Sequence, residues 1–211
     1  MKPLCLTELG PHILDVININ EIPFVKGSPG IGKSAMYKWV AEQLNLEFID
    51  FRLSMVDQTR LNGFPKFKDD RSFYAPPAIF PLEGDPLPEG KNGWLISFEE
   101  INSTVPSIQA MAYKILHDRM VGDYNLHPAV RLCANGNLET DGAVVMPLST
   151  ALASRMIQFH AVIKNDKWLE WAEKHNIHPF IIQYLTLTPK DLIVEPKDNI
   201  VISYPNPRTW H

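Results

Sequence analysis

A glycine-rich octapeptide constrains the fold and function of this chain more than any other feature. Residues 27–34 read Gly-Ser-Pro-Gly-Ile-Gly-Lys-Ser and satisfy the pattern G-x-x-x-x-G-K-[ST] in full. Glycines there let backbone N–H groups face phosphates, the lysine reaches the β and γ phosphates, and the serine hydroxyl binds Mg²⁺. We therefore predict a site for ATP or ADP with Mg²⁺, with Ser34 at the metal, formed by Gly27, Ser28, Pro29, Gly30, Ile31, Gly32, Lys33, Ser34 and Ala35.

The segments on either side of the octapeptide provide the context that such a loop requires. Residues 22–25 form a short apolar run, which is typical of a buried parallel strand. Met36, Val40 and Leu44 are spaced four apart, which predicts an amphipathic helix over residues 33–45. Residues 46–53 alternate and predict a second strand. The order strand, loop, helix, strand indicates a βαβ unit.

The alternation of strands and helices continues to about residue 162. Pro106 in a first turn predicts a helix capped by Ser103 or Thr104, and residues 148–154 predict a short helix. Hairpins are expected around Asp69-Asp70 and Gly122-Asp123. Residues 1–20 show no clear period. Further strands are predicted over residues 94–98, 130–134 and 156–162.

This pattern predicts an α/β fold, a parallel sheet with helices on both faces. We assign residues 1–162 to this nucleotide-binding core. Residues 163–211 are assigned to a small helical lid, with helical patterns over residues 166–175 and 179–185. This lid is either minimal or incomplete.

Composition narrows the class of protein. The chain has 211 residues and a formal net charge of -4, which argues against general attraction to nucleic acid. Cys5 and Cys133 lie far apart without metal-binding spacing, so we expect reduced, packed thiols. No apolar run approaches the roughly 18 residues of a membrane span, and no N-terminal signal is visible, so we expect a cytoplasmic protein.

Two acidic residues follow the apolar strand predicted over residues 94–98. In proteins with this phosphate loop, an acid at such a strand end orients Mg²⁺, and a second one polarises the attacking water. We therefore predict Glu99 at the metal and Glu100 as the catalytic base. Glu99 carries one methylene more than the usual aspartate, so altered metal geometry is expected. The alternative is a pair of solvated surface acids.

These motifs resemble those of the AAA+ ATPases, most closely the MoxR-like branch, from about residue 21 to residue 210. The resembling segments are the Walker A loop at residues 27–34, the Walker B strand at 97–102, the sensor-1 strand at 131–137, the arginine-finger segment at 147–156 and the sensor-2 segment at 207–210.

The resemblance implies three more catalytic residues. Asn137 would hold the attacking water or the γ-phosphate, Arg155 would enter the neighbouring subunit's site, and Arg208 would reach the γ-phosphate from the lid. The alternatives are a turn asparagine for Asn137 and a surface salt-bridge arginine for Arg155.

The resemblance also implies a function and partners. It implies Mg-dependent ATP hydrolysis in a homo-oligomeric ring, a hexamer, that remodels or matures a partner protein, with a von Willebrand factor A-type protein as one candidate. The relatives are bacterial and phage proteins. The two hairpins resemble a helix-2 insert and a pre-sensor-1 hairpin, so Phe67, Phe73 and Tyr74 either contact a partner or pack locally.

Two other functions remain open. Glu99 and the short lid favour an ATP-binding switch with little or no hydrolysis. A nucleic-acid translocase is the other alternative, and the absence of a concentrated basic patch in the sequence counts against it.

Overall fold

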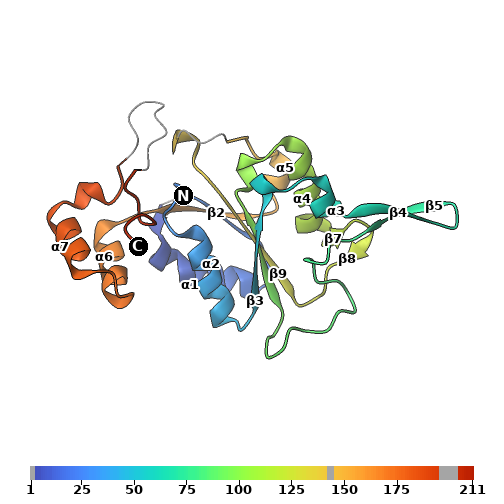
Figure 1. The fold of residues 1–211 in the computed structure, drawn as a ribbon, viewed down its shortest axis with the longest axis horizontal. Coiled ribbons are helices and arrows are strands. Elements are labelled where there is room, and N and C mark those ends of the chain that lie inside the picture. The colour runs from blue at the N-terminus through green and yellow to red at the C-terminus, as the bar shows by residue number, and fades with distance from the viewer. Residues whose placement is uncertain (1–2, 142–144, 195–203) are drawn as a thin grey trace.

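The computed structural model describes residues 3–141, 145–194 and 204–211, and its body is a sheet with helices on both faces (Figure 1). The elements follow in the order β1 (Leu4–Cys5), α1 (Leu6–Asn18), β2 (Pro23–Lys26), α2 (Lys33–Gln43), β3 (Glu47–Arg52), η1 (Leu53–Met55), α3 (Gln58–Asn62), β4 (Phe64–Lys68), β5 (Arg71–Ala75), β6 (Trp94–Glu99), η2 (Ile101–Ser103), α4 (Pro106–Asp118), β7 (Met120–Val121), β8 (Tyr124–Asn125), β9 (Val130–Gly136), η3 (Glu139–Asp141), α5 (Thr150–Ala153), β10 (Ile157–Val162), α6 (Asn165–Lys174), α7 (Pro179–Leu187) and η4 (Pro189–Asp191).

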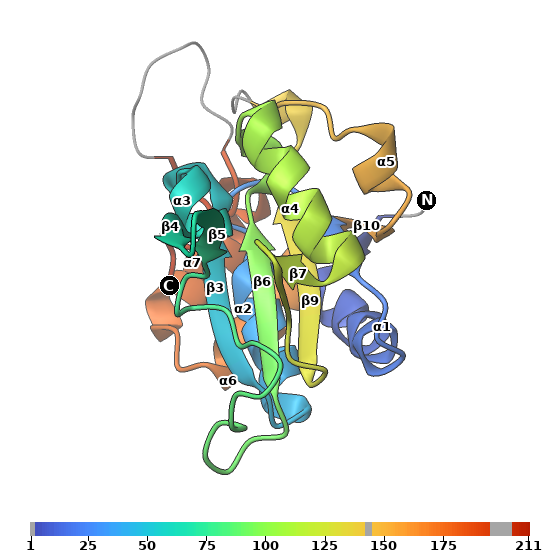
Figure 2. The ribbon, with the colours of Figure 1, turned by 90° about the vertical axis from the view of Figure 1, so that its right-hand side faces the viewer.

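In the described residues, six strands form one sheet in the order β1-β10-β2-β9-β6-β3. All of its strand pairs are parallel. Parallel neighbours need long crossover connections, and α4 lies on the one between β6 and β9. Helix α2 lies on the connection from β2 to β3, which are not neighbours in the sheet. Figure 2 shows α4 over one face of β6 and β9, with α2 behind the sheet. The predicted α/β fold, a parallel sheet flanked by helices, is confirmed.

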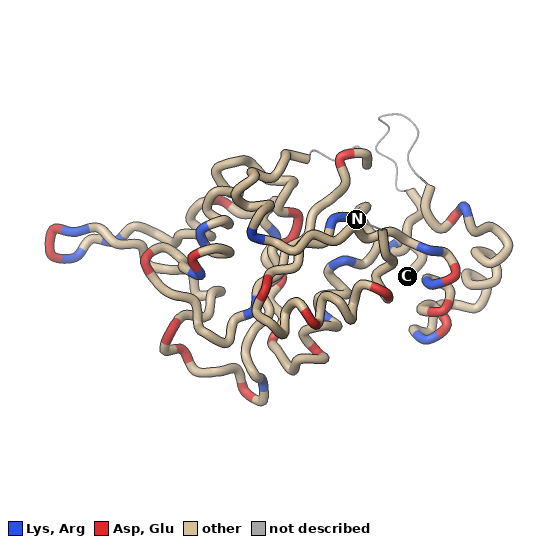
Figure 3. Tube along the Cα trace, turned by 180° about the vertical axis from the view of Figure 1, so that it is seen from behind, with Lys and Arg blue, Asp and Glu red and all other residues tan. Residues whose placement is uncertain are grey.

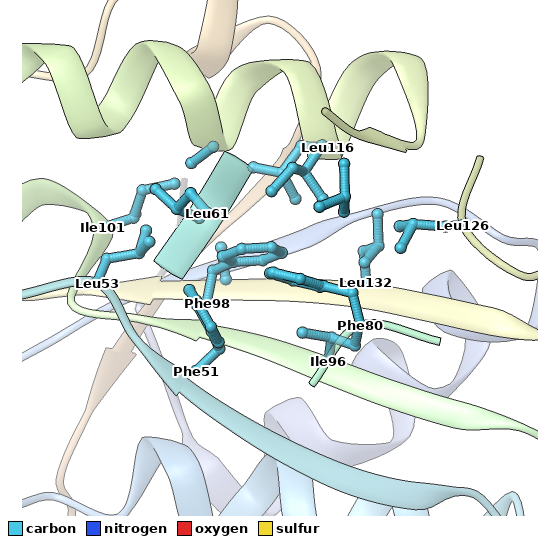
Figure 4. Close-up of a cluster of buried hydrophobic side chains, with 14 of the residues drawn as sticks. Phe51, Leu53, Leu61, Phe80, Ile96, Phe98, Ile101, Leu116, Leu126 and Leu132 are labelled. Carbon is cyan, nitrogen blue, oxygen red and sulfur yellow. The ribbon is translucent and has the colours of Figure 1, made fainter. Parts of the chain in front are cut away.

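Strand β6 shows why both faces of the sheet are covered. Every residue of Trp94–Glu99 is buried. Ile96 and Phe98 pack into the cluster beneath α4, which Figure 4 shows with Phe51 and Phe80. Leu95 faces the other way and packs with residues of α1 and α2. The alternation of strand side chains therefore divides the core into two layers.

Helix α1 and strand β1 were not predicted. Leu9, Ile13 and Ile17 of α1 are fully buried against the sheet, so the helix does have an apolar stripe. Pro11 lies inside the helix, where it cannot donate a backbone hydrogen bond, and this residue obscures the helical pattern in the sequence. Packing on the sheet stabilises the helix despite that loss.

The predicted cap of α4 was wrong, although the helix is present. Its N-cap is Val105, and Pro106 occupies the first turn. Thr104 instead donates to the carbonyl of Leu53 at 3.4 Å, and its own carbonyl accepts from Gln109. The hydroxyl therefore joins two segments of the core rather than the helix end.

Both predicted hairpins are present. β4 pairs with β5 and β7 pairs with β8, each antiparallel. Asp69 and Asp70 have φ values of 51° and 58°, as a tight two-residue turn requires. The β4–β5 hairpin projects from the body (Figure 1), and charges of both signs lie at its tip (Figure 3).

The C-terminal helices have a core of their own. A buried cluster joins α6, α7 and the segments that follow them, and it consists of Trp168, Ala172, Ile177, Leu185 and Leu192. The two helices match the patterns predicted from the sequence, while the domain boundary at residue 162 stays a prediction. In the part of the chain that the structure describes, no helix combines the length and the apolar character needed to cross a bilayer.

Candidate nucleotide-binding site

The glycine-rich loop lies between the end of β2 and the start of α2, as predicted. Gly30 and Gly32 have φ values of 78° and 105°, a backbone region that side-chain-bearing residues rarely occupy. A Cβ atom built on Gly30 would lie 2.6 Å from Oδ1 of Asn206. The positive φ therefore favours glycine at Gly30, and Asn206 of the C-terminal segment lies close beside it.

Lys33 lies inside this loop. Its side chain is buried, and Nζ donates to the carbonyls of Gly27 at 2.6 Å and Ser28 at 2.9 Å. Nζ also donates to Oδ1 of Asn137 at 3.2 Å. The lysine and the asparagine, 104 positions apart in the sequence, therefore meet at the same point.

Glu99 is buried at the end of β6 and is not a solvated surface acid. Ser34 donates through Oγ to Oε2 of Glu99 at 2.5 Å. Ser97 donates to Oε1 at 2.6 Å, and Asn135 donates through Nδ2 to Oε2, also at 2.6 Å. Three donors therefore compensate the loss of water around this carboxylate.

Glu100 turns away from the strand. Its φ and ψ are 58° and 38°, and its backbone N–H donates to Oδ1 of Asn135 at 3.1 Å. Its carboxylate accepts a hydrogen bond from Ser54 at 2.6 Å. The two neighbouring acids thus have different surroundings, since Glu99 is buried and Glu100 is only partly so.

These groups line one cavity of about 830 Å³, within the size range of small-molecule sites. The predicted residues on its wall are Pro29, Gly30, Ile31, Gly32, Lys33, Ser34, Ala35, Glu99, Glu100, Asn137 and Arg208. Gly27 and Ser28 adjoin it through the carbonyls that bind Lys33.

Arg155 does not line this cavity. It is exposed between α5 and β10, whereas Arg208 faces the cavity from the C-terminal segment. The structure therefore brings Asn137 and Arg208 to the loop of their own chain and leaves Arg155 apart from it.

The sequence did not indicate several residues of the cavity wall. Leu6 and Gly10 come from α1, Trp39 from α2, and Lys164 and Trp168 from the start of the C-terminal region. The sequence did not indicate Leu6 and Gly10 because helix α1 itself was not predicted. The wall therefore combines cations near the loop with apolar and aromatic surface, which suits a phosphorylated ligand that carries a flat ring.

An ion pair beside the cavity joins helix α1 to the segment that follows β10. Nζ of Lys164 lies 2.8 Å from Oε1 of Glu8. The hydrogen bond from Lys164 lowers the pKa of Glu8 to about 2, and the same bond raises the pKa of Lys164. Both groups are therefore charged at neutral pH, and α1 is tied to the segment that precedes α6.

We predict that Glu8→Gln lowers the melting temperature at pH 7, because it removes this pair. The folded-state pKa of Glu8 is depressed, so its stabilising effect is present above the unfolded pKa of about 4.5 and is lost as the pH falls toward 2. Thermal unfolding of both proteins from pH 7 to pH 2 should show a difference that shrinks below pH 4.5. A constant difference at every pH would contradict the assignment.

The residues around Glu99 also suit the Mg²⁺ ion that the loop implies. The hydroxyl of Ser34 and the carboxylate of Glu99 place hard oxygen atoms side by side. Mg²⁺ commonly binds one or two protein oxygens together with substrate phosphates. In residues 3–141, 145–194 and 204–211, no group of three or more His, Cys, Asp or Glu side chains is arranged to hold a metal alone.

No family model matches this chain. No curated protein matches it either. Solved structures do share its fold. A predicted ATPase from Cytophaga hutchinsonii is 17% identical with a TM-score of 0.60, and the match covers 86% of this chain and 54% of that one.

NtrX from Brucella abortus is 15% identical with a TM-score of 0.53, and the match covers 87% of this chain and 46% of NtrX. A second NtrX structure, in complex with ADP, has a TM-score of 0.50 at 15% identity and covers 82% and 41%. The chain thus spans about half the length of the structures that it resembles. The likeness shows the α/β fold of the P-loop proteins.

Proposed function

We propose that this chain, with the α/β core of the P-loop nucleotide hydrolases, is an AAA+ ATPase that binds Mg-ATP and hydrolyses it. The observation that carries the proposal is the meeting of Lys33, the Ser34–Glu99 pair and Glu100 in one cavity. These are the phosphate, metal and water-activating groups that phosphoryl transfer to water requires. The ADP bound to the structurally similar NtrX supports nucleotide as the ligand.

The residues of the loop would bind the phosphates. Lys33 would exchange its bonds to the carbonyls of Gly27 and Ser28 for the β and γ phosphates, and the start of α2 would contribute its N–H groups. Ser34 and Glu99 would hold Mg²⁺, which neutralises phosphate charge when it is bound.

Glu100 would act on the water. In the structure its carboxylate accepts a hydrogen bond from Ser54 and lies on the cavity wall. In the reaction it would accept a proton from the attacking water as the new bond to the γ-phosphorus forms and the bond to the ADP oxygen breaks. Asn137, just after β9, and Arg208, in the C-terminal segment, would contact the γ-phosphate.

We further propose a MoxR-like homo-oligomeric ring, a hexamer, in which Arg155 completes the neighbouring subunit's site. The support is the exposed position of Arg155, outside the cavity of its own chain. In this proposal, ATP hydrolysis remodels or matures a partner protein, with a von Willebrand factor A-type protein as a candidate.

The β4–β5 hairpin is the surface that we propose for the partner. Phe67 is 82% exposed and Tyr74 is 43% exposed. Their cross-strand partners are Ser72 and Pro65, so both aromatic rings lie on one face, while Phe73 lies on the other face opposite Lys66. Exposed aromatic side chains on a projecting hairpin are typical of contact surfaces.

The test of the proposed function is ATP turnover by the protein and by Glu100→Gln. We expect the variant to lose about 100- to 1,000-fold in kcat, because glutamine cannot accept the proton, while ATP binding stays unchanged. Phosphate release gives kcat and calorimetry gives the affinity. Glu173→Gln, an exposed change on α6, is the matched control.

Two other results would lead to other conclusions. Tight ATP binding without turnover in the unaltered protein would favour the switch-like module over the ATPase. Equal turnover in Glu100→Gln and the unaltered protein would show that another group activates the water, and the role of Glu100 would be wrong.

A further inference from the structure

Asn135 lies between the two acids of the site and contacts both. It belongs to β9 and is 1% exposed. Its Nδ2 donates to Oε2 of Glu99 at 2.6 Å, and its Oδ1 accepts from the backbone N–H of Glu100 at 3.1 Å. One buried amide therefore joins a side chain and a main-chain group of consecutive residues.

The orientation of this amide follows from its partners. A carboxylate can only accept and a backbone N–H can only donate, so the NH₂ group must face Glu99 and the oxygen must face Glu100. The reversed amide would place Oδ1 against a carboxylate oxygen and leave a buried N–H opposite an NH₂ group. Both ends of Asn135 are therefore used, and its position is closely defined.

The bond to Glu100 holds an uncommon backbone turn. Glu100 has φ 58° and ψ 38°, in the left-handed region that non-glycine residues enter only when surrounding contacts stabilise it. Asn135 supplies such a contact on the backbone, and Ser54 supplies one on the carboxylate. This turn directs the side chain of Glu100 to the cavity wall while Glu99 stays buried.

The hydrogen bond from Asn135 to Glu99 fixes the position of the Glu99 carboxylate, whose side chain is one methylene longer than that of aspartate. Oε1 accepts from Ser97, and Oε2 accepts from both Asn135 and Ser34. Because Ser97 and Asn135 belong to adjacent strands β6 and β9, the carboxylate is held from the sheet side. Its Oε2 is thereby presented to the hydroxyl at the start of α2.

We propose that Asn135 is a positioning residue that sets the metal-holding carboxylate of Glu99 and the backbone turn of Glu100 together. The proposal rests on the Mg-nucleotide site proposed above. It assigns to Asn135 a role different from that of Asn137, which accepts a hydrogen bond from Lys33 of the glycine-rich loop. Loss of Asn135 should therefore weaken metal binding without weakening the phosphate loop itself.

The test measures ADP affinity with and without Mn²⁺, using a fluorescent ADP analogue, and counts free Mn²⁺ by electron paramagnetic resonance. For Asn135→Ala we expect Mn²⁺ affinity in the ADP complex to fall about 10- to 100-fold, as when a group that orients a metal ligand is removed. ADP affinity without metal should stay the same. Asn135→Leu, which keeps a branched side chain of adequate volume, should give the same result if the alanine variant does not fold.

A matched control separates positioning from simple loss of a buried amide. Gln109 is 5% exposed, and its amide donates to the carbonyl of Thr104, away from the cavity wall. Gln109→Ala should lower the melting temperature but leave the Mn²⁺ affinity of the ADP complex unchanged.

Each other outcome has a defined meaning. Unchanged Mn²⁺ affinity in a folded Asn135 variant would overturn the inference, and so would an equal fall in metal-free ADP affinity. If the unaltered protein binds ADP but Mn²⁺ does not affect the complex, the positioning role is wrong while nucleotide binding stands. If it binds no ADP under either condition, the proposed function fails and this inference fails with it.

Discussion

Replacing Lys33 by alanine should lower the affinity for ATP by at least about 100-fold, because two charge-assisted bonds to phosphate oxygens are lost. Lys33 is 7% exposed and has its ammonium group within the loop, in contact with Gly27, Ser28 and Asn137. Isothermal titration with ATP in the presence of Mg²⁺ measures the effect.

The variant keeps the backbone of the loop, which separates charge loss from loop collapse. Gly30 and Gly32 set the backbone turn, and neither is changed. Lys174→Ala removes an exposed lysine at the end of α6 and should bind ATP normally. Tight ATP binding by Lys33→Ala would show that the phosphates bind elsewhere, and the site assignment would then be wrong.

The parts of this site that could be predicted from the sequence are those that a short segment determines alone. The loop at residues 27–34 has a fixed spacing because one backbone turn needs it, and β2 and α2 adjoin it directly. The acids Glu99 and Glu100 were predictable for the same reason, since they end an apolar strand. The residues of each segment are neighbours in the sequence and also lie together in the folded site.

The role of Asn135 could not be predicted because it depends on strand register. Asn135 and Asn137 are the same residue type two positions apart, and spacing alone does not distinguish them. In the sheet, Phe98 pairs with Ala134, which places the following residue, Asn135, beside Glu99. Asn137 lies beyond the end of β9, where its side chain reaches Lys33 instead.

The remaining walls of the cavity depend on contacts between segments that are distant in the sequence. Glu8 and Lys164 are 156 positions apart, and Asn206 reaches Gly30 from near the end of the chain. Neither contact has a local sequence pattern. Helix α1 adds a second difficulty, since Pro11 interrupts its pattern although its packing on the sheet is complete.

Replacing Arg155 by alanine should lower kcat by about 1,000-fold or more while ATP affinity stays near normal, because an arginine that acts in trans stabilises charge only in the transition state. Arg155 is exposed and does not line the cavity of its own chain. In a shared site, activity per chain should also rise with protein concentration. Arg131→Ala, near the start of β9 and outside the cavity, is the control.

Mixing two inactive variants distinguishes action in trans from action in cis. A Lys33→Ala chain cannot bind ATP but can donate Arg155, and an Arg155→Ala chain can bind ATP but cannot donate the arginine. Mixed assemblies therefore contain sites with both groups, and ATP hydrolysis should reappear on mixing. If mixing restores no activity although the two variants co-assemble in sedimentation, Arg155 does not act on a neighbouring site. Full activity of Arg155→Ala alone would exclude the finger role altogether, and Arg208, which faces the cavity of its own chain, would then be the arginine to examine.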